Sequence, residues 1–157
     1  MTPKDYMDEI LLPSLAAYEA DTSSRRLAYL ACITMFHLKD FLEKAGVETP
    51  EVEMLKHCEA AWNVVHAVAV GAKHADNLGR PSKKNPIKFV AGTDDYRPPA
   101  VAGSMECGWS ECGDEVGSIV IPVVDEGDDN LALEADLLYS LRTVLLQYRK
   151  QFPMLVS

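Results

Sequence analysis

The side chains best suited to acid–base chemistry are three histidines within helical sequence patterns: His37, His66 and His74. His66 stands in the run AAWNVVHAVAVGAKHADN, residues 60–77, which is apolar on nearly every side, as in a helix buried all round. Burying a polar group without a partner costs about 1–3 kcal/mol. The sequence therefore predicts partner side chains, water, a ligand or a second subunit opposite the polar residues of this run.

These polar residues share one narrow face of the predicted helix. At about 100° per residue, a polar seam with steps of four and three residues is formed by Glu59, Asn63, His66, Val70, Lys73 and Asn77. Trp62, Val65 and Ala69 lie on the adjoining face, so the helix suits a position beside a cleft or an interface. Lys73 and His74 have a second interpretation, because cations near a helix C-terminus favour the helix dipole and reach solvent.

A second candidate pair, His37 and Asp40, lies in the preceding helical pattern. The two residues are three positions apart and can share a face. Such a pair can fix the histidine tautomer for acid–base work or ligate a metal. The alternative is a core histidine satisfied at a helix–helix contact. We expect the polar seam to face the second helix at residues 37–40.

Metal and cofactor motifs are missing from the sequence. His66 and His74 are eight residues apart, which is not the i, i+4 pair of helical zinc sites, and no Glu-x-x-His motif occurs. Cys107 and Cys112 lack the second cysteine pair of a zinc ribbon. No phosphate-binding loop, dinucleotide fingerprint or G-x-S-x-G nucleophile motif is present. We expect neither a metal nor a cofactor.

A local concentration of cations stands in an otherwise acidic chain. Its members are Lys73, His74, Arg80, Lys83, Lys84 and Lys88. Such a cluster can bind a phosphate, a nucleotide, an RNA backbone or the chain's own acidic segments, although charge runs are more often solvated faces. The candidate binding residues are therefore Asn63, Lys73, Arg80 and Asp40.

Composition predicts one globular domain over residues 1–157. The chain is 48% hydrophobic, and its formal net charge of -9 does not steer it toward nucleic acid or anionic membranes. No run approaches the roughly 20 apolar residues of a membrane span, and the first residues are charged where a signal peptide needs an apolar core. We expect a cytoplasmic protein with no membrane partner.

Four helices are predicted to position the candidate residues. The first covers residues 2–20, with Thr2 as its N-cap and a kink or split at Pro13. The second covers residues 24–45 and ends at Gly46, a residue type that favours helix C-termini.

The third and fourth helices flank a region of different character. The third covers about residues 50–77, with Thr49 as N-cap and Gly79 as its stop. The fourth covers about residues 129–152 and ends before Pro153.

The region 79–127, between the third and fourth helices, is predicted to be a loop and β-hairpin insertion. Its apolar runs at 87–91 and 116–124 are flanked by Gly-rich turns and predict two to three short antiparallel strands. Pro122 predicts that its strand is at an edge of the sheet. The expected fold is mainly α, a four-helix bundle with a small antiparallel β insertion.

The segment Phe36–Phe41, FHLKDF, followed by Asn63 and by Ala72-Lys73-His74, resembles a group of small bacterial and prophage proteins. These proteins carry an aromatic-His-x-x-Asp segment and a later Ala-Lys-His. They are similar in outline to HEPN helical bundles, some of which are dimeric ribonucleases of toxin–antitoxin and defence systems. The resemblance covers about residues 24–77 and implies architecture only, because the HEPN pattern of Arg followed four to six residues later by His is absent.

These features predict a binding or regulatory protein that works as a homodimer packed along the second and third helices. The rival hypothesis is an enzyme acting on RNA or another phosphate-bearing substrate. In it, His66 or His74 is the acid–base group, and Lys73 with Arg80 holds the phosphate. The hypotheses differ in whether His37, His66 and Lys73 converge on an open pocket or are used within the bundle.

Overall fold

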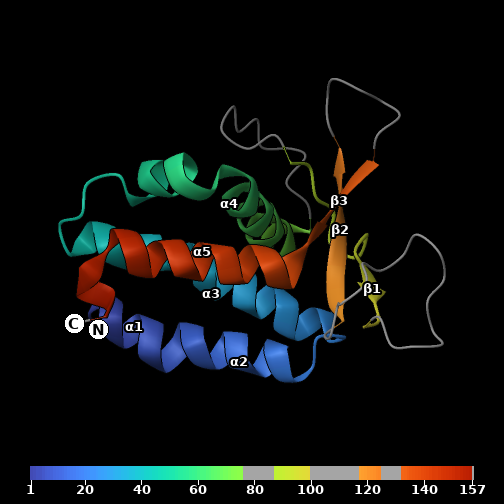
Figure 1. The fold of residues 1–157 in the computed structure, drawn as a ribbon, viewed down its shortest axis with the longest axis horizontal. Helices are drawn as coiled ribbons and strands as arrows, with labels where there is room; N and C mark the ends of the chain where they lie inside the picture. The colour runs from blue at the N-terminus through green and yellow to red at the C-terminus, as the bar shows by residue number, and fades with distance from the viewer. Residues whose placement is uncertain (76–86, 100–116, 125–131, 157) are drawn as a thin grey trace.

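The computed structural model describes residues 1–75, 87–99, 117–124 and 132–156. The predicted architecture is confirmed: the chain is a mainly α-helical bundle with a small antiparallel sheet at one end (Figure 1). The two termini lie side by side at the other end, where the last turn contacts the first helix (Figure 1). The helical elements are α1 (Pro3–Tyr6), the π-helical turn η1 (Met7–Leu11), α2 (Leu12–Ala20), α3 (Arg25–Lys44), α4 (Pro50–His74), α5 (Leu137–Gln151) and the 3-10 turn η2 (Pro153–Leu155).

The first three elements form one helical stretch that begins at a capping box. The Asp5 amide donates to Thr2 Oγ1 at 3.1 Å, and the Thr2 amide donates to Asp5 Oδ2 at 2.8 Å. The break expected at Pro13 takes the form of the π-helical turn that precedes it, and Leu11 and Leu12 keep right-handed helical dihedral angles. A wider turn accommodates a proline, which lacks an amide hydrogen and crowds the carbonyl four residues earlier.

The ends of α3 follow the local signals in the sequence. Ser24 is the N-cap, and its hydroxyl accepts a hydrogen bond from the Leu27 amide at 3.4 Å. Gly46 follows the helix with a φ of +89°, a backbone conformation that glycine adopts without strain.

The ends of α4 differ in part from the expectation. The helix begins at Pro50 as predicted, but Thr49 makes no side-chain cap because its own backbone is left-handed, with a φ of 47°. The helix ends at His74, where Ala75 adopts a φ of 70°, three residues before the predicted end. Asn77 and Gly79 lie outside the described residues.

α4 is also kinked at Cys58, which the sequence did not predict. Cys58 has a φ of -153° and a ψ of 47°, well outside the helical region. Figure 1 shows the resulting change of direction between the two halves of α4. The polar seam belongs to the second half, residues 59–74.

The sheet consists of β1 (Asp95–Arg97), β2 (Ser118–Val124) and β3 (Ala132–Asp136), in the order β1-β2-β3 and antiparallel throughout. The prediction that the last helix includes residues 132–136, and that the insertion ends at 127, is therefore wrong, whereas residues 129–131 lie outside the described residues. Pairing with β2 keeps residues 132–136 extended, since tertiary contacts override local helix propensity. α5 begins only at Leu137, with the Asp136 carboxylate accepting from the Tyr139 amide at 2.7 Å.

The prediction that Pro122 marks an edge strand is also wrong, because β2 is the central strand. Pro122 faces Glu134 of β3, whereas the pairing with β1 ends at Asp95 opposite Val120. β2 thus extends past its neighbour, and the proline stands where β1 requires no amide donor.

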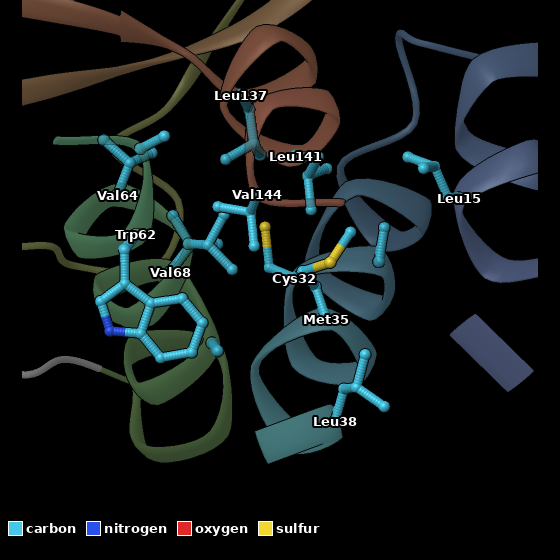
Figure 2. Close-up of a cluster of buried hydrophobic side chains, with 14 of the residues drawn as sticks. Leu15, Cys32, Met35, Leu38, Trp62, Val64, Val68, Leu137, Leu141 and Val144 are labelled. Carbon is cyan, nitrogen blue, oxygen red and sulfur yellow. The ribbon is translucent and has the colours of Figure 1, made fainter. Parts of the chain in front are cut away.

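The core lies where α4 packs against both α3 and α5. Figure 2 shows Trp62 and Val68 of α4 together with Val144 of α5 and Met35 of α3. From Ala61 to Ala69 every residue of α4 is buried except His66, which is half-buried. The prediction of a helix buried nearly all round is confirmed for these residues.

Candidate functional site

Phe36 of α3 is the centre of a cluster of aromatic and cationic side chains. The His66 ring stacks on the Phe36 ring, with centroids 4.5 Å apart and an interplanar angle of 10°. The His37 ring lies edge-on at 5.7 Å, and the Lys39 ammonium lies 4.9 Å from the ring centroid. His66, one member of the polar seam of α4, therefore contacts α3 next to His37, as the sequence predicted for this part of the seam.

His37 and Asp40 form the pair that their spacing suggested. The distance from His37 Nδ1 to Asp40 Oδ2 is 2.7 Å, and Lys39 donates to the other carboxylate oxygen at 3.2 Å. Partial burial opposes ionisation of Asp40, but the hydrogen bonds from His37 and Lys39 outweigh it and hold the pKa of this carboxyl below its usual value. An ionised Asp40 favours the tautomer in which Nδ1 carries the proton, which leaves Nε2 as the basic nitrogen of His37.

His66 contributes to the bundle as a neutral ring. Burial lowers the pKa of His66. Two smaller effects oppose each other, because the charge of Glu51 raises this pKa and the charge of Lys39 lowers it. At neutral pH the imidazole is therefore uncharged and packs on Phe36 as a flat aromatic surface. This contact uses one face of the ring that was a candidate for acid–base chemistry.

The remaining seam residues do not gather around His66. Asn63 is buried, with only 3% of its surface exposed. Lys73 and His74 are exposed in the last turn of α4. Lys73 is seven residues beyond His66, about 10 Å along the helix axis. The position of Lys73 and His74 matches that of cations at a helix C-terminus.

Only part of the predicted cationic cluster belongs to the described residues. Arg80 lies outside the described residues, as do Lys83 and Lys84. Lys88 is described and exposed.

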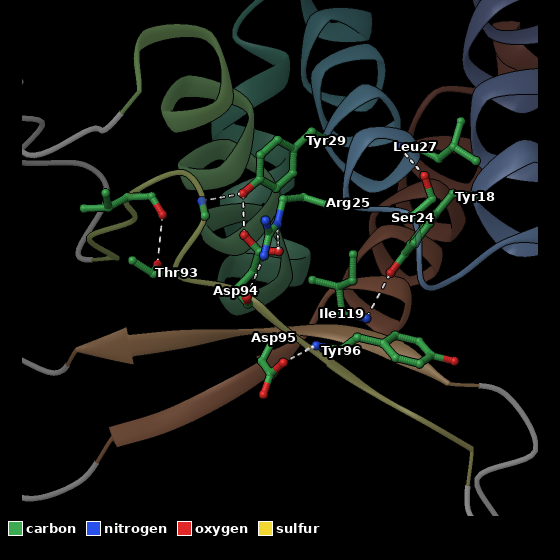
Figure 3. Close-up of polar contacts among 12 residues, drawn as sticks. Tyr18, Ser24, Arg25, Leu27, Tyr29, Thr93, Asp94, Asp95, Tyr96 and Ile119 are labelled. Atoms are coloured by element: carbon green, nitrogen blue, oxygen red, sulfur yellow. Dashed lines mark hydrogen bonds and ion pairs between the residues drawn. The ribbon is translucent and has the colours of Figure 1, made fainter.

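A polar network that the sequence did not reveal joins α3 to the segment before β1 (Figure 3). Arg25 Nε donates to Asp94 Oδ2 at 2.6 Å, and Arg25 also donates to the Asp94 carbonyl at 3.2 Å. The Tyr29 hydroxyl donates to Asp94 Oδ1 and accepts from the Gly92 amide at 2.9 Å. The partners of Asp94 are 69 and 65 positions away in the chain, so no local spacing in the sequence points to this network.

This network has the character of a structural connection. Asp94 is only 6% exposed, and its carboxylate is satisfied by Arg25 and Tyr29. Burial and the hydrogen bond to Asp94 raise the pKa of Tyr29 to about 12, so that its hydroxyl stays protonated and keeps donating. A second tie lies nearby, where the Ile119 amide of β2 donates to the Tyr18 hydroxyl at 3.2 Å (Figure 3).

Within the part of the chain that the structure describes, no group of three or more His, Cys, Asp or Glu side chains is close enough to hold a metal ion. Nor does any helix among these residues combine the length and apolarity needed to cross a membrane. Comparison of the chain with protein families, with curated proteins and with solved structures gave no match.

Proposed function

We propose that this is a binding or regulatory protein that works as a homodimer packed along α3 and α4. The observation that carries the proposal is the outer side of α3. There Leu30 is 40% exposed, and Ile33 and Phe36 are only half-buried. Apolar side chains exposed on one side of a helix gain free energy when a partner covers them.

The arrangement of the polar seam supports binding over catalysis. His66 stacks on Phe36 as a neutral ring, whereas Lys73 lies two turns further along α4. His66 and Lys73, which the enzyme hypothesis combines in one site, thus lie at different positions along α4. Packing of the seam against a neighbouring helix supports a structural role for it. The adjoining surface of α3 is then the surface that binds a partner.

The test is the mass of the protein in solution, by sedimentation equilibrium over a wide concentration range. The wild type is expected to reach twice the mass of the chain, and Leu30→Glu to shift toward monomer. Leu146→Glu is the matched control, because Leu146 is 63% exposed and belongs to α5, outside the proposed interface. A wild type that stays monomeric up to millimolar concentration contradicts the proposal.

A second candidate function is an enzyme that acts on RNA or another phosphate-bearing substrate. The 2.7 Å contact between His37 and Asp40 favours it, because a carboxylate that orients an imidazole is the arrangement of a general base. His66 or His74 then acts as the partner acid–base group, with Lys73 on the phosphate. Incubation with RNA compares the wild type with His37→Asn and His66→Ala. Equal, negligible cleavage by all three proteins at neutral pH excludes this candidate.

The proposal includes a cytoplasmic location and an architecture related to HEPN-like bundles of bacteria and prophages. Its support is the helical bundle itself, the aromatic-His-x-x-Asp segment on α3 and the Ala-Lys-His end of α4. An anionic ligand at Lys73 and His74 is tested by thermal denaturation with millimolar phosphate or nucleotide. A rise in Tm that Lys73→Ala abolishes supports such a ligand, and an unchanged Tm contradicts it.

A further inference from the structure

The outer side of α3 has the residue spacing of a coiled-coil contact. Steps of four and three residues connect one row, the α3 outer stripe, which consists of Arg26, Leu30, Ile33, His37, Asp40 and Lys44. In coiled coils this spacing keeps one row of side chains facing a partner helix. Here two apolar residues and a half-exposed histidine stand between charged residues at either end.

Among the residues that the structure describes, no helix covers this stripe. The buried residues of α3 lie on its other side and include Ala28, Cys32, Met35 and Leu42. Every member of the α3 outer stripe is exposed or half-buried. The stripe therefore presents a row about 25 Å long on the surface, from its first to its last residue.

Two charges of the stripe, those of Arg26 and Asp40, are placed symmetrically about Ile33. Arg26 and Asp40 are each seven residues from Ile33, in opposite directions. When two copies meet across a two-fold axis, a residue on one side of the centre meets the residue at the mirrored position of the other copy.

We propose that two copies of this chain pack α3 against α3, antiparallel, with the two-fold axis near Ile33. Arg26 of each copy then pairs with Asp40 of the partner subunit. Leu30 of each copy lies next to the central pair of isoleucines. This inference rests on the proposed homodimer and adds its register and its charge pairing.

The charges favour the antiparallel arrangement over a parallel one. A parallel pair in register places Arg26 beside Arg26 and Asp40 beside Asp40, and like charges in an interface are unfavourable. Asp40 is an anion, since hydrogen bonds from His37 and Lys39 hold its pKa below the usual value, and its side chain is 40% exposed, so the carboxylate can accept a further donor. Among the described residues Arg26 has no ion-pair partner, whereas Arg25 is paired with Asp94 and Arg142 with Glu19.

Charge exchange between two variants tests the register. Arg26→Asp places two carboxylates at each contact of its own homodimer, and Asp40→Arg places two guanidinium groups there. Each variant alone is expected to dimerise at least about tenfold more weakly than the wild type, since two symmetric contacts change from attraction to repulsion. Mixed in equal amounts, the two variants are expected to form a heterodimer in which both contacts are complementary again.

The double variant Arg26→Asp with Asp40→Arg restores complementary charges within one chain, and it is expected to form a homodimer. Arg149→Asp is the matched control, because Arg149 is exposed on α5 and the substitution changes the charge by the same amount. Circular dichroism of each variant verifies that the helices are retained.

The outcomes separate the two proposals. A monomeric wild type contradicts the homodimer itself. A dimeric wild type whose single variants dimerise normally, or whose mixed variants stay monomeric, overturns the antiparallel register while the homodimer stands. A heterodimer formed by mixing two variants that are each monomeric supports both the homodimer and its antiparallel register. A misfolded variant would not form this heterodimer, so the result also excludes misfolding as the cause of the monomeric state.

Discussion

The phenyl ring of Phe89 packs directly on Gly71 of α4, in the space that a side chain at this position would occupy. A methyl group on Gly71 would overlap the edge of the ring. Phe89 is 1% exposed and also meets the Tyr29 ring edge-on at 5.8 Å. The glycine thus allows the segment before β1 to lie against the bundle.

Gly71→Ala is therefore expected to destabilise the protein by about 1–3 kcal/mol, because Phe89 is overpacked. Helix propensity alone predicts the opposite, a gain of about 1 kcal/mol. Urea denaturation of Gly71→Ala measures the free energy of unfolding. A decrease supports overpacking, and an increase supports the effect of helix propensity. Gly71→Ala combined with Phe89→Leu should recover part of the loss, and a stabilised single variant contradicts the close contact.

Asp94→Ala is expected to lower the free energy of unfolding by about 2–3 kcal/mol, because the hydrogen bonds to Arg25 and Tyr29 are lost together. Asp95→Ala is the matched control, since that neighbouring residue is exposed and its carboxylate accepts a hydrogen bond from the adjacent Tyr96 amide. It should change stability by less than about 0.5 kcal/mol. A double-mutant cycle with Tyr29→Phe should show that the two losses are not additive, and full additivity is the contrary result.

The fully buried hydroxyls of Tyr18 and Tyr148 predict opposite responses to the same substitution. Tyr18 accepts a hydrogen bond from the Ile119 amide, so Tyr18→Phe should destabilise by about 1 kcal/mol. The Tyr148 hydroxyl has no hydrogen-bond partner among the described residues, so Tyr148→Phe should leave stability unchanged or raise it by about 1 kcal/mol. Chemical denaturation of both variants measures the difference, and equal losses would contradict it.

The stability of the protein is expected to fall as the pH drops from 7 to 5, in part through His66. Burial lowers the pKa of His66 in the folded state, so below about pH 6.5 the unfolded chain binds a proton that the folded chain does not. The contribution is complete above that pH and is lost as the pH falls through the folded-state pKa. His66→Phe should reduce the slope of the unfolding free energy against pH, whereas His74→Gln should retain the His66 contribution. An unchanged slope in His66→Phe would argue against a buried neutral ring.

Sequence signals located the helix ends where the deciding contact is local. The capping box of Thr2 and Asp5 spans three residues, and Ser24, Gly46 and Pro50 act on the adjoining turn. The contact between the polar seam and α3 was also predictable, because helical spacing places His66 on a defined face.

The remaining features depend on residues far apart in the chain. β3 is extended because it pairs with β2, and Pro122 is tolerated because β1 stops short of it. The residue propensities of β2 and β3 alone predict neither the extended conformation of β3 nor the central position of the strand with Pro122. The Asp94 network also depends on residues far apart in the chain. The kink at Cys58 was not predictable because no glycine or proline lies beside it in the sequence.

The ties between sheet and bundle have a consequence for how the protein opens. The Tyr18 contact with Ile119 spans 101 positions, whereas the bundle is held by broad apolar packing along α4. Among its described residues, the sheet adds only Ile119 and Ile121 of β2 as buried members of the apolar core beside these polar contacts, and a region with fewer contacts can detach while the helices stay packed. Native-state hydrogen exchange should therefore show the amides of β1 exchanging through a sub-global opening of lower free energy, and those of α4 only on global unfolding. The sheet and the bundle would then be two cooperative units of one domain.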